Sequence, residues 1–299
     1  MGAAPKVPVR KTVAEIAAKL DELPTLPSVI YELNRVINDP MSSTSDVERL
    51  MANDQSLTTK VLKLANSAYY AIPGGVSSLQ RAIAYIGYDT INQLALSASI
   101  IKALSGHKSV SLDLPSFWKH SLGVAMAAEV IAKEVKYKTP SDLFTCGLVH
   151  DMGKVAIFII AEPQFGESVA YAKEHGLSLL ESEEALGLPK HTHVGFELAT
   201  KWRLPYQIQI SISNHHQRDP ALRGGLSQEA NLVVDIVYLA NLLVHALQFG
   251  FSGHQKVLGL PRDVLDRLSI PQDRLKDLIA KVKEKIQNAE GFLKIIGDP

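Results

Sequence analysis

The sequence predicts an all-α protein, and three features of the chain lead to that prediction. Apolar residues recur at three- and four-residue spacing along most of the 299 residues, whereas the alternating patterns typical of β-strands are scarce. Prolines, glycines and polar clusters fall between the periodic segments, where helices are expected to end. The hydrophobic content of 46% and the charged content of 21% are ordinary for a globular chain of one large or two smaller domains.

The first third of the chain divides into six expected helices. Pro24 and Pro27 bracket the link between the first two, and the Pro-Gly-Gly sequence at residues 73–75 marks a loop before the fifth. Ser45, with Glu48 three residues later, has the spacing of a capping box and predicts a helix start. The expected helices lie near residues 11–22, 26–38, 45–53, 55–66, 78–86 and 88–105.

Eight further helices are expected in the rest of the chain. They lie near residues 115–136, 141–153, 163–174, 177–186, 190–203, 205–216, 228–248 and 271–291. Asp142, after Pro140, resembles a helix start, and Gly153 is expected to end that helix. The polar stretch from Ser105 to Pro115 is the best candidate boundary. The sequence therefore predicts a two-part helical bundle, with an N-terminal helical subdomain over residues 11–105 and a second helical domain over residues 114–292.

Charge, the apolar runs and the cysteine content argue against several classes of protein. Lys plus Arg and Asp plus Glu both number 31, so no bulk attraction to nucleic acid or to an anionic membrane is expected. The first ten residues lack the apolar stretch of a signal peptide, and charges interrupt the apolar runs before the length of a membrane span. The single cysteine, Cys146, is expected to be a buried thiol. We expect a cytoplasmic protein of undefined oligomeric state.

Seven polar residues in the second half of the chain stand out because of their positions. In a chain with ten histidines, a His-Asp or a His-His dipeptide alone carries little information. Each of the seven, however, lies on or beside the apolar stripe of an expected helix, as His120 does between Phe117 and Val124. The seven are His120, His150, Asp151, His191, His215, His216 and Asn241.

Burying five imidazoles, a carboxylate and an amide on the inward faces of five helices costs free energy unless these groups find partners. A shared metal centre provides one, because neutral imidazoles bind transition metals and Asp151 supplies negative charge. The residue types predict one or two divalent transition ions and do not distinguish iron, manganese, zinc and nickel. The alternative is a set of unrelated buried polar contacts.

Lys154 has two interpretations. One turn after the His-Asp pair, it could contact a phosphate oxygen near the metals. Alternatively, it is a solvated lysine that the dipole of a helix C-terminus favours. The remaining histidines lack the inward pattern, although His245 shares a face with Asn241. These remaining residues are His107, His175, His193, His245 and His254.

Eight short segments carry a pattern that extends over about residues 13–285: Leu23–Pro27, Val61–Tyr70, Ala82–Gly87, Phe117–Ser121, His150–Lys154, His191–Gly195, Trp202–Pro205 and His215-His216. Taken together, these segments resemble the HDOD family. HDOD domains are similar to the HD superfamily of metal-dependent phosphohydrolases and to the HD-GYP phosphodiesterases of cyclic dinucleotides. The resemblance implies that the second domain is HD-like and binds metal.

Carried over by position, the resemblance also implies individual roles. His120, His150, Asp151, His191, His215 and His216 match metal ligands of the wider group. Asp151 matches an aspartate that bridges two metals, and Lys154 matches the lysine after the His-Asp pair. In an active enzyme these two would be the catalytic residues.

Three departures from the pattern bear on activity. Asn241 stands where an aspartate is usual, which weakens one metal position, and Ser116 replaces a glutamate that some HD-GYP enzymes carry. Residues 217–220 contain no Gly-Tyr-Pro, which argues against hydrolysis of cyclic di-GMP. The resemblance thus implies a bacterial regulatory or signalling protein that acts through a protein partner or a phosphorylated small molecule. The alternative is an active phosphohydrolase that cleaves a phosphate ester or nucleotide with a metal-activated water.

Overall fold

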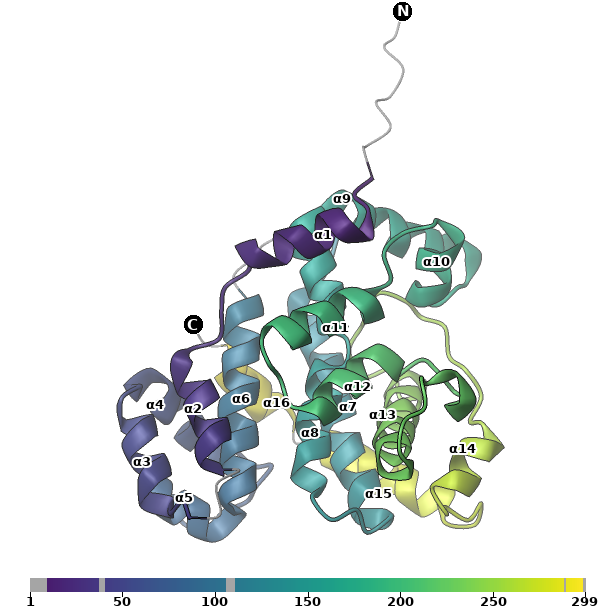
Figure 1. Ribbon diagram of the computed structural model, residues 1–299. Coiled ribbons are helices and arrows are strands. Elements are labelled where there is room, and N and C mark those ends of the chain that lie inside the picture. The colour runs from purple at the N-terminus through teal and green to yellow at the C-terminus, as the bar shows by residue number, and fades with distance from the viewer. Residues whose placement is uncertain (1–9, 38–40, 106–110, 288, 298–299) are drawn as a thin grey trace, which may run out of the picture.

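The computed structural model describes residues 10–37, 41–105, 111–287 and 289–297, and among these residues it contains helices and loops but no β-strand. The all-α prediction is confirmed. The N-terminal helices are α1 (Val13–Lys19), η1 (Leu20–Glu22), α2 (Ser28–Ile37), α3 (Thr44–Ala52), α4 (Gln55–Ala65), α5 (Leu79–Ile86) and α6 (Tyr88–Leu104). In Figure 1, α2 to α5 gather at one side of the molecule, and α6 lies between them and the helices α7 (Leu114–Glu134) and α8 (Pro140–Val149).

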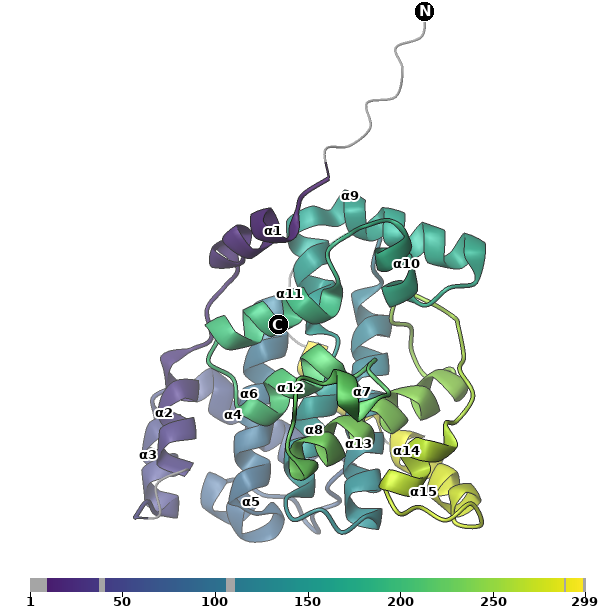
Figure 2. The ribbon, with the colours of Figure 1, turned by 45° about the vertical axis from the view of Figure 1, so that its right-hand side comes forward.

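The second part of the chain supplies the centre and the opposite side of the molecule (Figures 1 and 2). Its elements are α7 (Leu114–Glu134), α8 (Pro140–Val149), α9 (Met152–His175), α10 (Leu179–Ala185), α11 (His191–Lys201), α12 (Tyr206–Asn214), η2 (Pro220–Leu222), α13 (Gln228–Ala246), α14 (Arg262–Arg267), α15 (Leu275–Gln287) and α16 (Ala289–Gly297). Here α7 packs against α8, α13 and α15, so α7 is the central helix of this part.

The helices α6, α7 and α8 are buried on most of their surface, which explains why their apolar residues extend around the helix and do not form a narrow stripe. One hydrophobic core includes residues from Ile16 to Phe292. The helix α1 packs on α9 and α11, and α16 packs on α4, α6 and α7, so the first and the last described helices contact helices distant in sequence. Part of the proposed boundary, residues 106–110, lies outside the described residues, and the division at 105 and 114 stays a prediction.

The capping box of α3 lies two residues before its expected place. Ser43 and Asp46 form it, with the backbone N–H of Ser43 donating to Asp46 Oδ2 at 2.9 Å. Ser45 and Glu48 have the same spacing but lie inside the helix. The prediction was wrong because two serine–acid pairs overlap in the sequence and only the backbone path distinguishes them.

The helix expected over residues 141–153 was also wrong at its end. The helix α8 stops at Val149, and α9 begins at Met152, so Gly153 lies in the first turn of a new helix. This helix continues through a kink at Ala161, just before Pro163, where the missing N–H of proline interrupts the ladder. The apolar run of residues 155–160 is buried almost throughout, so no periodicity marked it as helical.

Two shorter elements differ from the expectation near the C-terminus. The six-residue helix α14 was not predicted, because so short a segment carries little periodic signal. The single helix expected over residues 271–291 is divided into α15 and α16. Cys146 is buried as predicted, and this burial raises the pKa of its thiol to about 12.

Two helical stretches, Pro140–His175 and Gln228–Ala246, have the length and hydropathy of membrane spans. However, 89% and 72% of their most apolar windows are buried inside the protein. Apolar helices of this kind are typical of the core of a soluble protein.

Candidate metal centre

The six candidate histidine and aspartate residues meet where five helices come together, namely α7, α8, α9, α11 and α12, and most lie at helix ends. His150 follows α8 and Asp151 directly precedes α9. His191 is the first residue of α11, and His215 with His216 follows α12. His120 lies within α7, and Asn241 lies within α13 beside it. The expected helices 190–203 and 205–216 had already placed His191 near a helix start and His215 and His216 at a helix end. The position of His150 and Asp151 between two helices is a finding of the structure.

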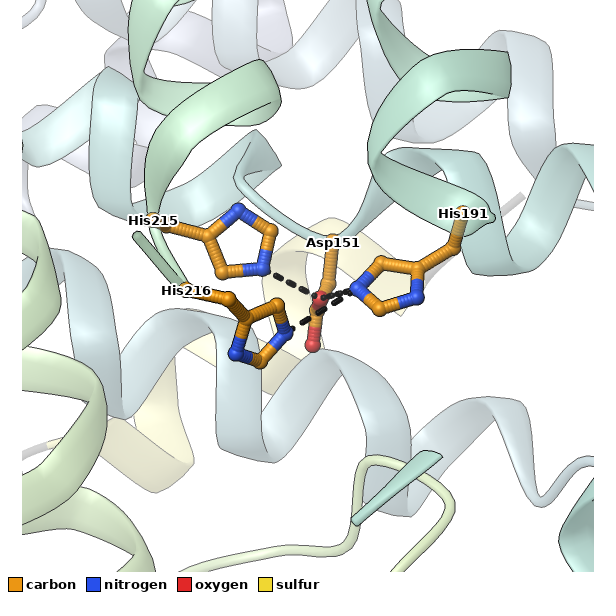
Figure 3. A group of neighbouring side chains, drawn as sticks. All are labelled: Asp151, His191, His215 and His216. Carbon is orange, nitrogen blue, oxygen red and sulfur yellow. Dashed lines mark hydrogen bonds and ion pairs between the residues drawn. The ribbon is translucent and has the colours of Figure 1, made fainter. Parts of the chain in front are cut away.

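Asp151 is the common member of two groups of potential ligands. One group is Asp151 with His191, His215 and His216, and the other is Asp151 with His120 and His150; within each, the ligand atoms lie within 4.8 Å of one another. Figure 3 shows the three histidines of the first group pointing toward Asp151. A carboxylate shared in this way could bridge two ions.

The distances place histidine nitrogens at both oxygens of Asp151. His215 Nε2 lies 3.2 Å and His191 Nε2 lies 3.5 Å from Oδ1, while His150 Nε2 lies 3.2 Å from Oδ2. His191 Nε2 also lies 3.1 Å from the Nε2 atom of His216. The side chains of Asp151, His150, His191 and His215 are inaccessible to solvent.

The positions at helix ends determine which nitrogen of each ring carries hydrogen. His150 Nδ1 lies 2.7 Å from the carbonyl oxygen of Gly147, and His215 Nδ1 lies 3.0 Å from that of Ile212. Carbonyl oxygens near a helix C-terminus lack helical partners and can only accept, so Nδ1 must be the donor in both rings. In a neutral imidazole the Nε2 atom then has a free lone pair directed at Asp151.

His191 follows the same rule with a carboxylate as acceptor. Its Nδ1 atom lies 2.8 Å from Glu183 Oε2, and Glu183 also accepts the backbone N–H of His191 at 3.1 Å. A carboxylate behind a ligating histidine orients the ring and increases the basicity of the opposite nitrogen. Glu183 was missed from the sequence, because it lies in an acidic run that looks like a solvated helix face.

In the centre, histidine nitrogens with free lone pairs face the oxygen atoms of Asp151, so hydrogen-bond acceptors face other acceptors. Burial lowers the pKa of His215 to about 4, so this ring is neutral near pH 7. Burial would raise the pKa of Asp151, but His150 and Lys154 hold that pKa well below its usual range. Among the described residues, His150 Nε2, His215 Nε2 and Asp151 Oδ1 are buried and have no hydrogen-bond partner. A cation between them would satisfy all three atoms, so the residues fit a metal ion.

Lys154 is buried and bound to the centre. Its Nζ atom donates to Asp151 Oδ2 at 2.7 Å and to the carbonyl oxygen of Ser252 at 3.0 Å, and the side chain is only 1% exposed. The interpretation as a solvated lysine at a helix C-terminus is therefore wrong. The lysine lies in the first turn of α9, and its positive charge compensates the negative charge of Asp151.

Gly153 allows α9 and α11 to approach closely enough to bring Asp151 and His191 together. A Cβ atom on Gly153 would lie 1.9 Å from the carbonyl oxygen of His191 and 2.7 Å from the backbone nitrogen of Gly195. Both atoms belong to the backbone, so neither can move aside cheaply. The glycine that was expected to end a helix thus serves a close helix contact.

Two pockets flank the buried centre. One has a volume of about 530 Å3 and is lined by His120, His245 and His254 together with Gln248 and Gln255. The other has a volume of about 240 Å3 and includes His216 with His193 and Lys190. Asp151 is in neither lining. His245 and His254 were set aside from the sequence, and His107 lies outside the described residues.

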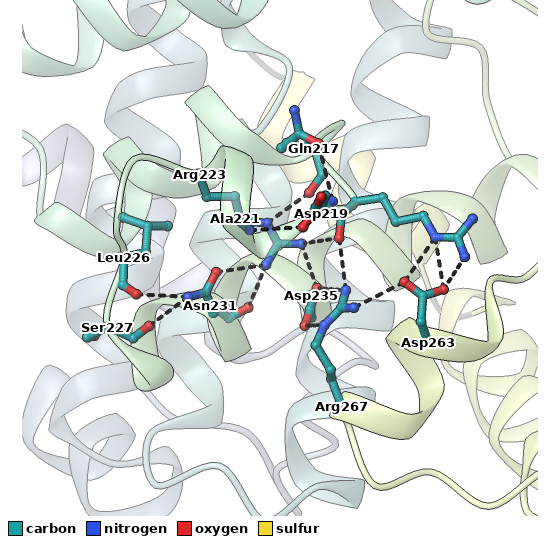
Figure 4. A network of polar contacts seen from close by, with 11 residues as sticks. Gln217, Asp219, Ala221, Arg223, Leu226, Ser227, Asn231, Asp235, Asp263 and Arg267 are labelled. Atoms are coloured by element: carbon teal, nitrogen blue, oxygen red, sulfur yellow. Dashed lines mark hydrogen bonds and ion pairs between the residues drawn. The ribbon is translucent and has the colours of Figure 1, made fainter.

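A second buried polar network secures the chain after His216 (Figure 4). Arg223 Nε donates to the carbonyl oxygen of Gln217 at 2.8 Å, and Arg267 donates to that of Arg218 at 3.0 Å. Both arginines also bind Asp235 in α13. The segment that follows the His215-His216 pair is therefore held in place by α13 and α14.

Comparisons with known proteins agree with this geometry. Residues 23–218 match the HDOD domain. An HDOD domain protein of unknown function from Geobacter sulfurreducens has a similar structure, with a TM-score of 0.72 and 27% identity over 90% of this chain and 97% of that chain. A Shewanella amazonensis SB2B protein, provisionally named a phosphohydrolase, has a TM-score of 0.68 and 23% identity over 96% of this chain and 97% of its own. This second likeness concerns the fold alone.

Two further relatives extend the comparison. A protein from Marinobacter aquaeolei VT8, provisionally assigned to signal transduction, shares the fold with a TM-score of 0.75 and 18% identity, over 97% of this chain and 62% of that chain. An uncharacterized protein of Treponema pallidum strain Nichols is 25% identical over 94% of this chain. The chain spans about half the length of this Treponema relative, namely 52%.

Proposed function

Because the chain belongs to the HDOD domain family, we propose that it is a regulatory protein that binds one or two divalent transition metals around Asp151. The observation that carries this proposal is the set of unpartnered acceptors in the buried centre. Histidine nitrogens lie at both oxygens of Asp151, and the Nδ1 atoms of these rings are already hydrogen-bonded, which is how metal ligands are commonly arranged.

Burial of the centre favours a regulatory role over catalysis. The side chains of Asp151, His150, His191 and His215 are inaccessible to solvent, and Lys154 Nζ is bonded to Asp151 and to the carbonyl oxygen of Ser252. A metal at this place would join α7, α9, α11 and α12, so metal binding would alter how firmly these helices hold together. We propose that a signalling partner in the cytoplasm, or a phosphorylated small molecule, responds to that change.

A metal-dependent phosphohydrolase is the second candidate, and one observation favours it. The pocket of about 530 Å3 reaches His120, at the edge of the Asp151 centre, and has room for a small ester. A bound divalent metal would supply an activated water and neutralise charge on a phosphoryl group. In this function Lys154 would exchange its contact with Asp151 for a phosphate oxygen.

The first test is the metal content of protein purified without a metal-affinity column, measured by plasma mass spectrometry. Wild-type protein is expected to contain one or two equivalents of a transition metal, and Asp151→Asn is expected to lose them. His175→Gln is the matched control, because His175 is exposed and stacks on Tyr171 away from the centre. Equal metal content in all three proteins would contradict the proposed function.

The second test separates regulation from catalysis. Metal-loaded protein is assayed against a generic phosphodiester and a panel of nucleotides, beside Asp151→Asn and Lys154→Met. Hydrolysis that disappears in both variants, with the fold retained, would replace the regulatory proposal by the enzymatic one. Tight metal binding without hydrolysis supports regulation.

A further inference from the structure

The two groups of potential ligands around Asp151 differ in how far the protein already occupies their atoms. One adjoins the Oδ1 atom, which has no hydrogen-bond partner among the described residues, and the other has a ring at Oδ2. We call them the three-histidine group and the two-histidine group, and their members beside Asp151 are His191, His215 and His216 in the first and His120 and His150 in the second.

In the three-histidine group, the donor atoms are spaced like ligands of a single ion. His215 Nε2 lies 3.2 Å and His191 Nε2 lies 3.5 Å from Asp151 Oδ1. The Nε2 atoms of His191 and His216 are 3.1 Å apart. Two nitrogen ligands at about 2.0–2.1 Å from a tetrahedral zinc ion are about 3.3–3.4 Å apart, and the three distances are close to that value. This group therefore has the spacing of a four-ligand site, with the carboxylate as its charged member.

The hydrogen atoms of this group can be arranged so that every ligand atom keeps a free lone pair. His191 and His215 carry their hydrogen on Nδ1, so in the contact between His191 and His216 the donor is His216 Nε2. The other tautomer of His216 has its hydrogen on Nδ1, and this tautomer directs the Nε2 lone pair at the group. His216 also lines the pocket of about 240 Å3, which gives an ion a path to the group.

In the two-histidine group, the amide of Asn241 engages the ring of His120. The Oδ1 atom of Asn241 lies 3.0 Å from His120 Nε2. With Oδ1 as the acceptor, Nε2 carries a hydrogen atom, and with the amide turned, its N–H group donates to the Nε2 lone pair. In both orientations His120 Nε2 has no free lone pair for a cation. The amide is neutral, so it also adds no negative charge to this group.

Lys154 supplies a positive charge at the same group. Its Nζ atom donates to Asp151 Oδ2 at 2.7 Å and to the carbonyl oxygen of Ser252 at 3.0 Å, and its side chain is 1% exposed. His150 Nε2, which is buried without a hydrogen-bond partner, lies 3.2 Å from the same Oδ2 atom. An ammonium group bound to Oδ2 repels a divalent ion at that oxygen, and Asn241 provides no charge that would offset the repulsion.

Resting on the proposed metal-binding function, we propose that the protein binds a single transition ion through Asp151 Oδ1 and the three-histidine group, and that Lys154 and Asn241 close the two-histidine group to a second ion. Three imidazoles and one carboxylate suit zinc, cobalt, nickel or iron. Magnesium fits this set poorly, because it prefers oxygen ligands.

Titration of metal-free protein with Co2+ tests the position of the ion, with visible absorbance and plasma mass spectrometry as readouts. Wild-type protein is expected to bind one equivalent. His191→Gln is expected to weaken binding by more than tenfold, because even residues behind a ligand contribute about 10–100-fold to metal affinity. His120→Gln is expected to keep the equivalent with wild-type affinity, and the exposed His175→Gln is the control that should match the wild type.

A second experiment opens the closed position. Lys154→Met removes the ammonium group and Asn241→Asp restores a carboxylate, so the double variant is expected to bind two equivalents of Co2+. The matched control combines Lys154→Met with Asn241→Leu, which removes the amide without adding charge, and it is expected to bind one. Circular dichroism of the metal-free proteins checks the fold. If the double variants do not fold, the comparison of His191→Gln with His120→Gln decides.

The outcomes separate this inference from the proposed function. Two equivalents in wild-type protein would overturn the inference and leave the proposed function intact. Loss of the ion in His120→Gln but not in His191→Gln would place the ion in the two-histidine group and would also overturn the inference. A folded Lys154→Met/Asn241→Asp variant that binds one equivalent would show that these side chains do not close the second position. If wild-type protein binds no transition metal, the proposed function itself is wrong.

Discussion

Two buried carboxylates in this protein have opposite surroundings. Asp235 is 2% exposed and accepts from Arg223 at 2.6 Å and from Arg267 at 2.7 and 2.8 Å, so both of its oxygens are paired with cations (Figure 4). Asp151 is fully buried, and Lys154 pairs with its Oδ2 atom alone. The Oδ1 atom lies 3.2 Å from His215 Nε2 and 3.5 Å from His191 Nε2 (Figure 3), and it has no hydrogen-bond partner among the described residues.

The contrast shows how a structural cluster differs from a binding site. Every strong group around Asp235 is matched within the protein, so the network needs no ligand and holds the loop after His216 to α13 and α14. Around Asp151, by contrast, the buried atoms His150 Nε2, His215 Nε2 and Asp151 Oδ1 have no hydrogen-bond partner. A fold retains such a deficit when a ligand compensates it, and unpaired buried acceptors point to a cation.

The largest expected effect comes from a substitution that breaks the ion-pair network around Asp235. Asp235→Ala leaves buried Arg223 and half-buried Arg267 without their carboxylate and is expected to destabilise the metal-free protein by about 3–5 kcal/mol. Denaturant unfolding measures this loss. Asp263→Ala, at the exposed end of the same network, is the control and is expected to cost about 1 kcal/mol or less. Equal losses in the two variants would contradict the structural role of Asp235.

Acidification is expected to destabilise the protein through its buried histidines. Burial lowers the pKa of His215 and of His245 to about 4 from 6.5, so the unfolded chain takes up protons first as the pH falls. Stability is therefore complete above about pH 6.5 and declines toward pH 4, by on the order of 3 kcal/mol for His215. Unfolding of metal-free protein at several pH values measures the decline. His215→Gln is expected to have a flatter profile, and an unchanged profile would sink this assignment.

Bound metal is expected to stabilise the protein through the Asp151 centre and independently of the arginine network. At a free metal concentration of about 100 times Kd, bound metal is expected to add about 2.7 kcal/mol of stability. Thermal unfolding with zinc and with a chelator measures the difference. Asp151→Asn is expected to abolish it, whereas Asp263→Ala in the arginine network is expected to retain it. Retention by Asp151→Asn would remove Asp151 from the metal site.

The smallest effect concerns the spacing between Asp151 and His191. Gly153→Ala forces a Cβ atom against the backbone of α11 and is expected to cost about 1–3 kcal/mol and to lower metal affinity. Gly259→Ala is the control, because nothing lies within 4 Å of a Cβ atom there, and it is expected to stay within about 0.5 kcal/mol. Unfolding midpoints and metal content report both. Wild-type metal affinity in Gly153→Ala would show that the close contact does not position the centre.

Helical periodicity carried much of this information before any coordinates. The spacing of apolar residues predicted an all-α fold, and it placed His120 and Asn241 on inward faces, where they lie within α7 and α13. The ends of helices were harder to predict. No proline or glycine lies between α8 and α9 to mark the break. Only the polar pair His150 and Asp151 interrupts the apolar run there, and Gly153 comes after α9 has begun.

The sequence by itself determined the helical class and which histidines and aspartate are candidates, because both follow from residue types and from spacing within one helix. Only the tertiary structure decided which nitrogen of each ring is free and which groups remain unpaired. Those properties depend on partners far apart in the chain, such as Ser252 at Lys154, 98 residues away, and His254 beside His245. Local periodicity contains no information about such contacts, because packing between helices creates them.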